Sequence, residues 1–226
     1  LSFVLIYRSG DRSALGLIGI FSLIFFLINK PLRKKVIKVF FLFLIISIFI
    51  TLQNPKIFER NFNDTIGQFK GKYYEKFLDD NNNETKLNFM IFSFHHQTHY
   101  STAFRMFMDQ PIFGHGPKSF RFKCKNFEFK PPKDITNTAG DTKKSYGCST
   151  HPHNTYLQLL SETGIIGFSF VFYLFLYLCY KIFILAKNNR KFFPHSALVI
   201  GIFINLWPIV PTGNFFNNWV SMIYFI

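Results

Sequence analysis

The chain has 226 residues, of which 49% are hydrophobic and 20% aromatic, and its formal net charge is +14. A strongly basic chain can bind nucleic acid, but 15 of its 26 basic residues fall in positions 53–155, where ten acidic residues dilute them. Two further clusters, in residues 30–38 and 181–191, contain no acids and flank long apolar runs. This pattern is typical of the cytoplasmic anchors of membrane spans. The distribution of charge therefore argues against a nucleic-acid partner.

Apolar runs of membrane-spanning length alternate with these basic clusters. A helix of about 17 residues rises roughly 26 Å, which is close to the hydrocarbon thickness of a bilayer. The sequence predicts an all-α, polytopic membrane protein with a bundle of transmembrane helices. Because the chain begins at Leu1 and ends inside an apolar run, we expect it to be a fragment of a longer protein. The expected spans are the end of one in residues 1–7, then 13–29, 36–52, 165–185 and the shorter 197–210, with a last apolar run from Trp219.

The positive-inside rule places both basic clusters in the cytoplasm, so the long polar segment 53–155 should face the opposite, periplasmic side. Three regions follow: transmembrane helices in residues 1–52, an external loop with short helices in 53–155, and a re-entry helix with C-terminal transmembrane helices in 156–226. We expect a multi-pass protein of the inner (cytoplasmic) membrane. Residues 79–84 form a polar, low-complexity patch within the external loop.

The external loop should contain an amphipathic helix and a disulfide. Residues 95–109 have helical periodicity, and Pro111 should stop the helix. Cys124 and Cys148 are 24 residues apart, and a bond between them is our hypothesis, because disulfides persist in an oxidising exterior. Cys179 lies inside an expected span and should be a packing residue. The apolar stripe of the helix is expected to consist of Tyr100, Ala103, Phe104, Phe107 and Met108.

A short polar helix should lead back into the membrane. Ser149 or Thr150 resembles an N-cap, with Pro152 at the first helical position. Gly164 should end the helix. Asn154, Gln158 and Glu162 recur every four residues and should share one face. His153, near the start of this helix, is half a turn out of phase with Glu162, so this carboxylate should not orient it.

Two histidine pairs raise the alternative of a metal site. His95 and His99 have i, i+4 spacing, and His151 and His153 are close in sequence. Neither a ligating cysteine pair nor a His-Glu-x-x-His motif accompanies them, so we expect no metal. The residues from Gly114 to Gly116 favour a tight turn over a phosphate cradle, because no strand precedes them.

Two arginines lie near the outer end of an expected span. Arg8 either extends its charged end to the membrane interface or contacts substrate. Arg12 has small neighbours that leave room for a headgroup, and arginine binds phosphate bidentately.

Three motifs follow one another along the chain. They are Pro111-Ile-Phe-Gly114-His-Gly116, then Cys148-Ser-Thr-His-Pro-His153-Asn154-Thr-Tyr-Leu157, then Glu162-Thr-Gly164-Ile-Ile-Gly167. These motifs and their order resemble the O-antigen ligase and polymerase family over most of the chain. The upstream residues Ser9-Gly-Asp-Arg12-Ser-Ala-Leu are similar to that family's arginine motif. The resemblance implies an enzyme that moves a glycan from undecaprenyl pyrophosphate to a sugar hydroxyl on a glycolipid or glycan, without metal or cofactor.

By this resemblance, His153 is the candidate base for the acceptor hydroxyl and Arg12 a contact of the pyrophosphate. The family's second arginine, at the start of the amphipathic helix, is missing here, so His99 or Arg105 takes its role or the clamp is incomplete. We favour a ligase; the alternatives are a polymerase of the same family and, from another class, a transporter, which would place polar groups near the bilayer midplane. The candidate substrate-binding residues are Arg8, His99, Arg105, Arg121, His151, Asn154 and Glu162.

Overall fold

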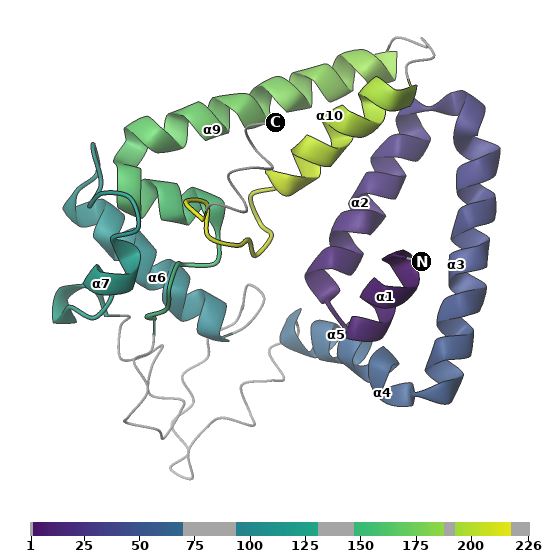
Figure 1. Ribbon diagram of the computed structural model, residues 1–226, viewed down its shortest axis with the longest axis horizontal. Helices are drawn as coiled ribbons and strands as arrows, with labels where there is room; N and C mark the ends of the chain where they lie inside the picture. The colour runs from purple at the N-terminus through teal and green to yellow at the C-terminus, as the bar shows by residue number, and fades with distance from the viewer. Residues whose placement is uncertain (1, 70–93, 131–146, 188–192, 218–226) are drawn as a thin grey trace. The chain divides into compact units, whose positions relative to one another are not determined.

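The computed structural model describes residues 2–69, 94–130, 147–187 and 193–217. Every regular element in these ranges is a helix (Figure 1). The predicted polar patch at 79–84 and the apolar run from Trp219 lie outside the described residues. In chain order the helices are α1 (Ser2–Ser9), α2 (Arg12–Ile28), η1 (Lys30–Leu32), α3 (Arg33–Gln53), α4 (Pro55–Phe58), η2 (Glu59–Asn63), α5 (Asp64–Phe69), α6 (Phe94–Asp109), α7 (Phe120–Lys123), η3 (Phe127–Phe129), α9 (Thr155–Lys187) and α10 (Phe193–Asn205).

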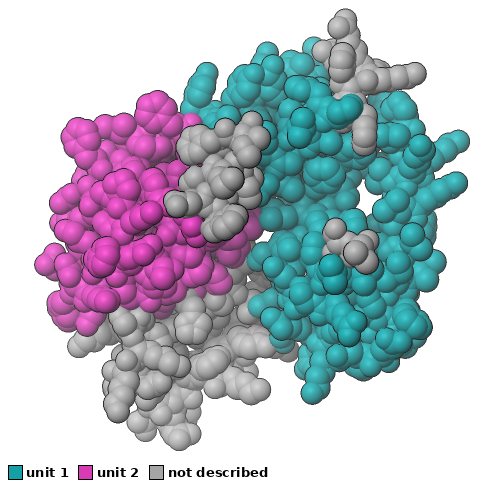
Figure 2. All heavy atoms as spheres, viewed as in Figure 1, with its two compact units in different colours: residues 1–65, 173–207 teal, residues 66–172, 208–226 magenta. Residues whose placement is uncertain are grey.

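The chain divides into two units, drawn in different colours in Figure 2. Unit 1 comprises residues 1–65 and 173–207, and unit 2 comprises residues 66–172 and 208–226.

Unit 1 contains the predicted spans at 13–29 and 36–52, which correspond to α2 and α3. The Tyr7 hydroxyl lies 2.8 Å from the Thr51 hydroxyl and joins α1 to α3. The hydroxyl of the buried Ser196 donates to Asn29 Oδ1 at 3.1 Å, which joins the start of α10 to the C-terminal end of α2. These polar contacts satisfy hydroxyl groups between otherwise apolar helices, where an unpaired group would be costly.

The expected span at 197–210 is wrong at its C-terminal end, because α10 ends at Asn205. Pro208 has no backbone N–H to continue a helix. The carbonyl of Pro208 instead accepts a hydrogen bond from the side chain of Asn154 at 2.8 Å. The described residues after α10 form turns and irregular backbone, and from Pro208 onward they belong to unit 2.

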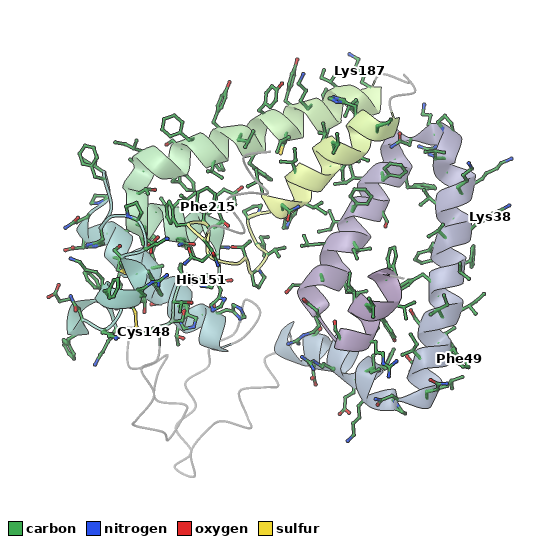
Figure 3. The ribbon with its side chains drawn as sticks, viewed as in Figure 1. Lys38, Phe49, Cys148, His151, Lys187 and Phe215 are labelled. Carbon is green, nitrogen blue, oxygen red and sulfur yellow. A yellow bond between two sulfur atoms is a disulfide. The ribbon has the colours of Figure 1, made fainter. Side chains whose placement is uncertain are left out.

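Two described helices are long and apolar enough to cross a membrane: Lys30–Gln53 and Thr155–Lys187. No side chain of α3 is buried within the structure. Phe49 on this helix, labelled in Figure 3, is 61% exposed. An apolar helix that is exposed over its length suits a hydrocarbon solvent, because lipid can cover side chains that water would not.

Unit 2 has a small apolar core to which α6 contributes. The predicted helix at 95–109 is confirmed as α6. Of its predicted apolar stripe, Ala103 is buried, whereas Phe104 and Met108 are 51% and 62% exposed. Thr98, Thr102 and Met106 are buried instead, so the inward face contains small polar residues that the stripe omitted. The core residues are Ala103, Met106, Phe120, Cys124 and Phe129.

A disulfide joins Cys124 to Cys148, as hypothesised from the sequence, with their Cα atoms 5.1 Å apart. Cys124 belongs to the core, and Cys148 packs against it. The bond thereby ties the loop that leads into α9 to the end of α7. Cys179 is not in a disulfide.

Candidate active site: a histidine cluster at the start of helix α9

The turn at residues 111–116 docks on α9 through two glycines. Gly114 and Gly164 have φ angles of +66° and +65°, which favour glycine. A Cβ atom on Gly114 would lie 2.6 Å from the backbone nitrogen of Gly164, so both residues must lack side chains. The N–H of Gly116 donates to the Glu162 carbonyl at 2.8 Å, and the N–H of Ile165 donates to the Pro111 carbonyl at 2.8 Å. The first and third motifs are therefore two halves of one contact, and Gly164 interrupts the helical backbone as predicted.

Glu162 is fully buried at this contact. Its carboxylate accepts the backbone N–H of Phe120 at 2.9 Å and that of Lys118 at 3.0 Å. Phe120 begins α7, so the carboxylate satisfies an N–H that a helix start leaves without a partner. In this structure Glu162 thus fixes the turn and α7 in place, and its predicted substrate contact stays a prediction.

The start of α9 differs from the prediction that Ser149 or Thr150 is the N-cap. The helix begins at Thr155, and Asn154 Oδ1 accepts the N–H groups of Tyr156 and Leu157 at 3.0 and 3.1 Å. Asparagine is among the strongest N-capping residues. His153 has a φ of +58°, which no residue in an α-helix adopts, so the helix cannot start at Pro152.

The predicted polar face of α9 is confirmed, and it binds the segment that follows α10. Gln158 is fully buried, and its Nε2 donates to Glu162 Oε2 at 3.0 Å and to Asn214 Oδ1 at 2.7 Å. Gln158 Oε1 accepts the N–H of Phe215 at 2.9 Å. Each polar group of this amide has a partner, as burial requires. Figure 3 labels Phe215, which lies on this segment, and His151.

Four imidazoles gather where α6 meets the loop before α9. The ring centroid of His153 lies 4.1 Å from that of His151, 5.5 Å from that of His99 and 5.6 Å from that of His96. The structure thus joins three of the predicted site residues. His96 was not predicted to belong to the site, although its position three residues before His99 places both on one helical face.

The backbone and His151 hold His153 in position. The N–H of Thr212 donates to the His153 carbonyl at 2.9 Å. His151 Nε2 lies 3.2 Å from the Thr212 carbonyl, and its Nδ1 lies 3.0 Å from the Thr150 hydroxyl. Only a protonated nitrogen can donate to a carbonyl, so Nε2 carries a proton. Both nitrogens of His151 are therefore engaged, and its ring is held beside that of His153.

Burial disfavours the charged forms of His151 and His153. Loss of solvent around the His151 ring, together with the neighbouring His153 and Arg121, lowers the pKa of His151 to about 4, although its bond to the Thr212 carbonyl opposes the shift. Burial also lowers the pKa of His153. A half-buried imidazole that is neutral and still reaches solvent can accept a proton.

The cluster does not have the geometry of a metal centre. Within the described ranges, no group of three His, Cys, Asp or Glu side chains is arranged to hold a metal ion. Both nitrogens of His151 are also engaged by Thr150 and Thr212. The side chain of His95, half of the predicted His95–His99 pair, lies outside the described residues.

The candidates for a second cation in unit 2 differ in position. Arg105 is exposed on α6, whereas His99 contacts the His153 ring. Arg121 on α7 is half-buried, and its charge contributes to the low pKa of His151. The arrangement favours His99 and Arg121 over Arg105 as neighbours of the candidate base.

The two predicted arginines of unit 1 lie at either side of a turn. Arg8 is exposed near the end of α1, and Arg12 is the half-buried first residue of α2. Asp11 caps α2, because its carboxylate accepts the N–H groups of Ser13 and Ala14 at 3.0 and 3.1 Å. The N-terminal cap therefore fixes the start of α2 and with it the backbone of Arg12.

Helices of membrane-spanning length and a polar unit with a histidine cluster are features of a helical membrane protein with a candidate active site. A family model described as O-antigen ligase matches residues 1–172, which is more than half of the chain. The chain belongs to the O-antigen ligase family, as its motifs predicted. A search of curated proteins and a search of solved structures found no match.

Proposed function

We propose that this chain transfers a glycan from undecaprenyl pyrophosphate to a sugar hydroxyl, in a reaction of the ligase type. Family membership supports the coarser assignment to a membrane glycosyltransferase. The transfer reaction itself is inferred from the environment of His153. This imidazole is half-buried, its pKa is lowered, and Thr212 and His151 fix its position. We find no hydrogen bond to the His153 ring in the part of the chain that the structure describes, so its nitrogens are available to a substrate.

In this proposal His153 acts as the general base. The acceptor hydroxyl oxygen forms a bond with the anomeric carbon of the donor glycan. The bond between that carbon and the phosphate oxygen breaks, and undecaprenyl pyrophosphate leaves with the electron pair. The hydroxyl proton moves to the neutral imidazole of His153. Because the donor already carries a good leaving group, no nucleotide sugar or cofactor is needed.

Arg12 would stabilise the negative charge that develops on the leaving pyrophosphate. A guanidinium presents parallel N–H donors that match two phosphate oxygens, whereas an ammonium acts as a point charge. The separate supports for this role are the position of Arg12 beside a capped helix start and the small residues around it. We also propose that the segment 53–155 lies on the periplasmic side of the inner membrane, where such a donor is presented.

A reconstituted transfer assay tests the proposal. The purified chain in lipid vesicles would receive an undecaprenyl-pyrophosphate-linked glycan together with either a lipid A core or a free glycan as acceptor. Transfer to the lipid A core is expected, and transfer to the glycan alone would instead identify a polymerase. Arg12→Lys should lower turnover strongly while cysteine labelling shows the 53–155 loop still outside. Wild-type turnover by Arg12→Lys would remove Arg12 from the site.

A further inference from the structure

Arg60, which no motif of the sequence singled out, lies beside Arg12 in unit 1. The two arginines line one polar pocket of about 370 Å³, whose walls are Ser9, Gly10, Asp11, Arg12, Ser13 and Arg60. Within unit 1 the pocket lies where the turn between α1 and α2 meets η2. Residues 48 positions apart in the chain therefore present two guanidinium groups to one space.

The backbone of unit 1 holds Arg60 in this position. Asn61, the next residue, is buried, and its Nδ2 donates to the carbonyl of Tyr7 at 3.1 Å. Tyr7 is in turn joined to Thr51 of α3. η2 is a five-residue π-helix, a rare form that often marks functional sites. These contacts dock η2 on the α1–α2 turn.

Gly10 makes the room that Arg60 needs. Its φ of +69° favours glycine, and a Cβ atom at this position would lie 2.7 Å from Arg60 Cδ and 2.9 Å from Arg60 Nε. The stem of Arg60 thus crosses the backbone of Gly10 to reach the pocket.

The charges in the pocket suit an anion with several oxygens. Its lining holds two guanidinium groups and one carboxylate, that of Asp11. One Asp11 oxygen already accepts the N–H groups of Ser13 and Ala14. We find no hydrogen bond or ion pair of Arg60 within the described ranges, so its donors are open to a ligand. Two planar forks favour a diphosphate over a single carboxylate, because each fork can take two oxygens.

We propose that Arg60 and Arg12 together bind the diphosphate group of the lipid-linked donor. This inference rests on the proposed function and adds a second cation to it: Arg60, from the segment after α3, supplies a guanidinium in place of the arginine that is missing at the start of the amphipathic helix. An apolar groove is lined by Leu15 and Phe62, each two residues further along the chain than a residue of the polar pocket. A diphosphate that carries an isoprenoid chain should therefore bind more tightly than inorganic pyrophosphate.

The experiment measures binding of farnesyl diphosphate to the full chain in phosphatidylcholine nanodiscs, with inorganic pyrophosphate as a competitor. Arg60→Gln should weaken binding about tenfold, which is about 1.4 kcal/mol, because it removes hydrogen bonds between the guanidinium and the diphosphate. Lys56→Gln, which removes one exposed positive charge from the preceding α4, should bind like the wild type. Arg60→Lys keeps the stem over Gly10 and the charge but loses the fork, so it should bind between these limits.

Binding by Arg60→Gln at the wild-type level would overturn the inference, as would an equal loss in Lys56→Gln, which would indicate a general charge effect. If the melting curve shows that Arg60→Gln is unfolded, Arg60→Lys provides the test. Wild-type affinity in Arg60→Lys would contradict diphosphate binding by two guanidinium groups. Equal affinity for inorganic pyrophosphate and the lipid would support the pocket but assign it to a soluble diphosphate. Because binding is read without turnover, an Arg60-dependent affinity in a chain that transfers no glycan would leave this inference standing and reject the proposed function.

Discussion

The carboxylate of Glu162 accepts the backbone N–H of Phe120 at 2.9 Å, across 42 positions of the chain. This bond and its partner to Lys118 connect the third family motif to the residues after the first. Since α9 also presents His153 just before its first turn, the buried glutamate connects α7 and the core to the helix that positions the candidate base.

Glu162→Gln should destabilise the protein. Glutamine has one acceptor oxygen in place of two, so either the Lys118 or the Phe120 N–H would lose its partner in a buried site. An unsatisfied buried group costs about 1–3 kcal/mol. Thermal unfolding in detergent should show a lower midpoint for Glu162→Gln, whereas Glu128→Gln, an exposed acid on η3, should match the wild type. Equal midpoints for both variants would contradict the structural role.

Alanine at Gly114 or Gly164 should weaken the contact between the turn and α9. Both positions have positive φ, and at both the new Cβ would meet backbone atoms that cannot move aside. The matched control is Gly19→Ala in α2, where a Cβ would meet nothing within 4 Å. Alanine in a helix is favoured over glycine by about 1 kcal/mol. Limited proteolysis should cut the Gly114→Ala and Gly164→Ala variants faster and leave Gly19→Ala unchanged or slower to be cut.

The stability of the protein should fall as the pH falls from 6.5, the ordinary pKa of histidine, toward about 4, the pKa of His151 in the folded state. The sign follows from the lowered pKa: the unfolded chain binds the proton first, so acid favours unfolding across this interval, and the stability is fully present above it. The midpoint of unfolding should drop less steeply in His151→Asn than in the wild type. Parallel curves would show that His151 does not titrate in this way.

Removal of the disulfide should destabilise unit 2. In the chain-entropy model a loop of this length contributes about 3 kcal/mol. Cys124→Ser should unfold at a lower temperature, and a reductant should lower the wild-type midpoint to a similar value. Cys179→Ser should unfold like the wild type and respond to the reductant as the wild type does. A wild type that is insensitive to reductant would contradict a stabilising bond.

The helices at the expected spans were predictable because their sequence signal is local. Hydropathy and charge along α2 and α3 depend on neighbouring residues only, so the predicted ranges and the helices agree within a few positions. The end of α10 was missed, because Pro208 takes its partner from Asn154, more than 50 residues away. This long-range hydrogen bond is not visible in the local apolar pattern from which the span at 197–210 was predicted.

The site was predictable in its members more than in its geometry. The motifs identified His151 and His153, but not the left-handed backbone of His153, which depends on a hydrogen bond from Thr212 on a distant segment. Asn154 was recognised as polar, yet its function as the N-cap follows only once that backbone is known. His96 precedes His99 by three residues, and this spacing could have indicated that His96 joins the cluster. Nothing in the sequence indicates that Arg60 lies near Arg12.

The most direct test of the proposed mechanism is the single-turnover rate of glycan transfer by purified His153→Gln in lipid vesicles. Glutamine keeps a polar side chain of similar reach but cannot accept a proton near neutral pH. The rate should fall by about 10²–10⁴-fold, while His195→Gln, which alters an exposed histidine on α10, should transfer like the wild type. Transfer by a folded His153→Gln at the wild-type rate would contradict the assignment of His153 as the base.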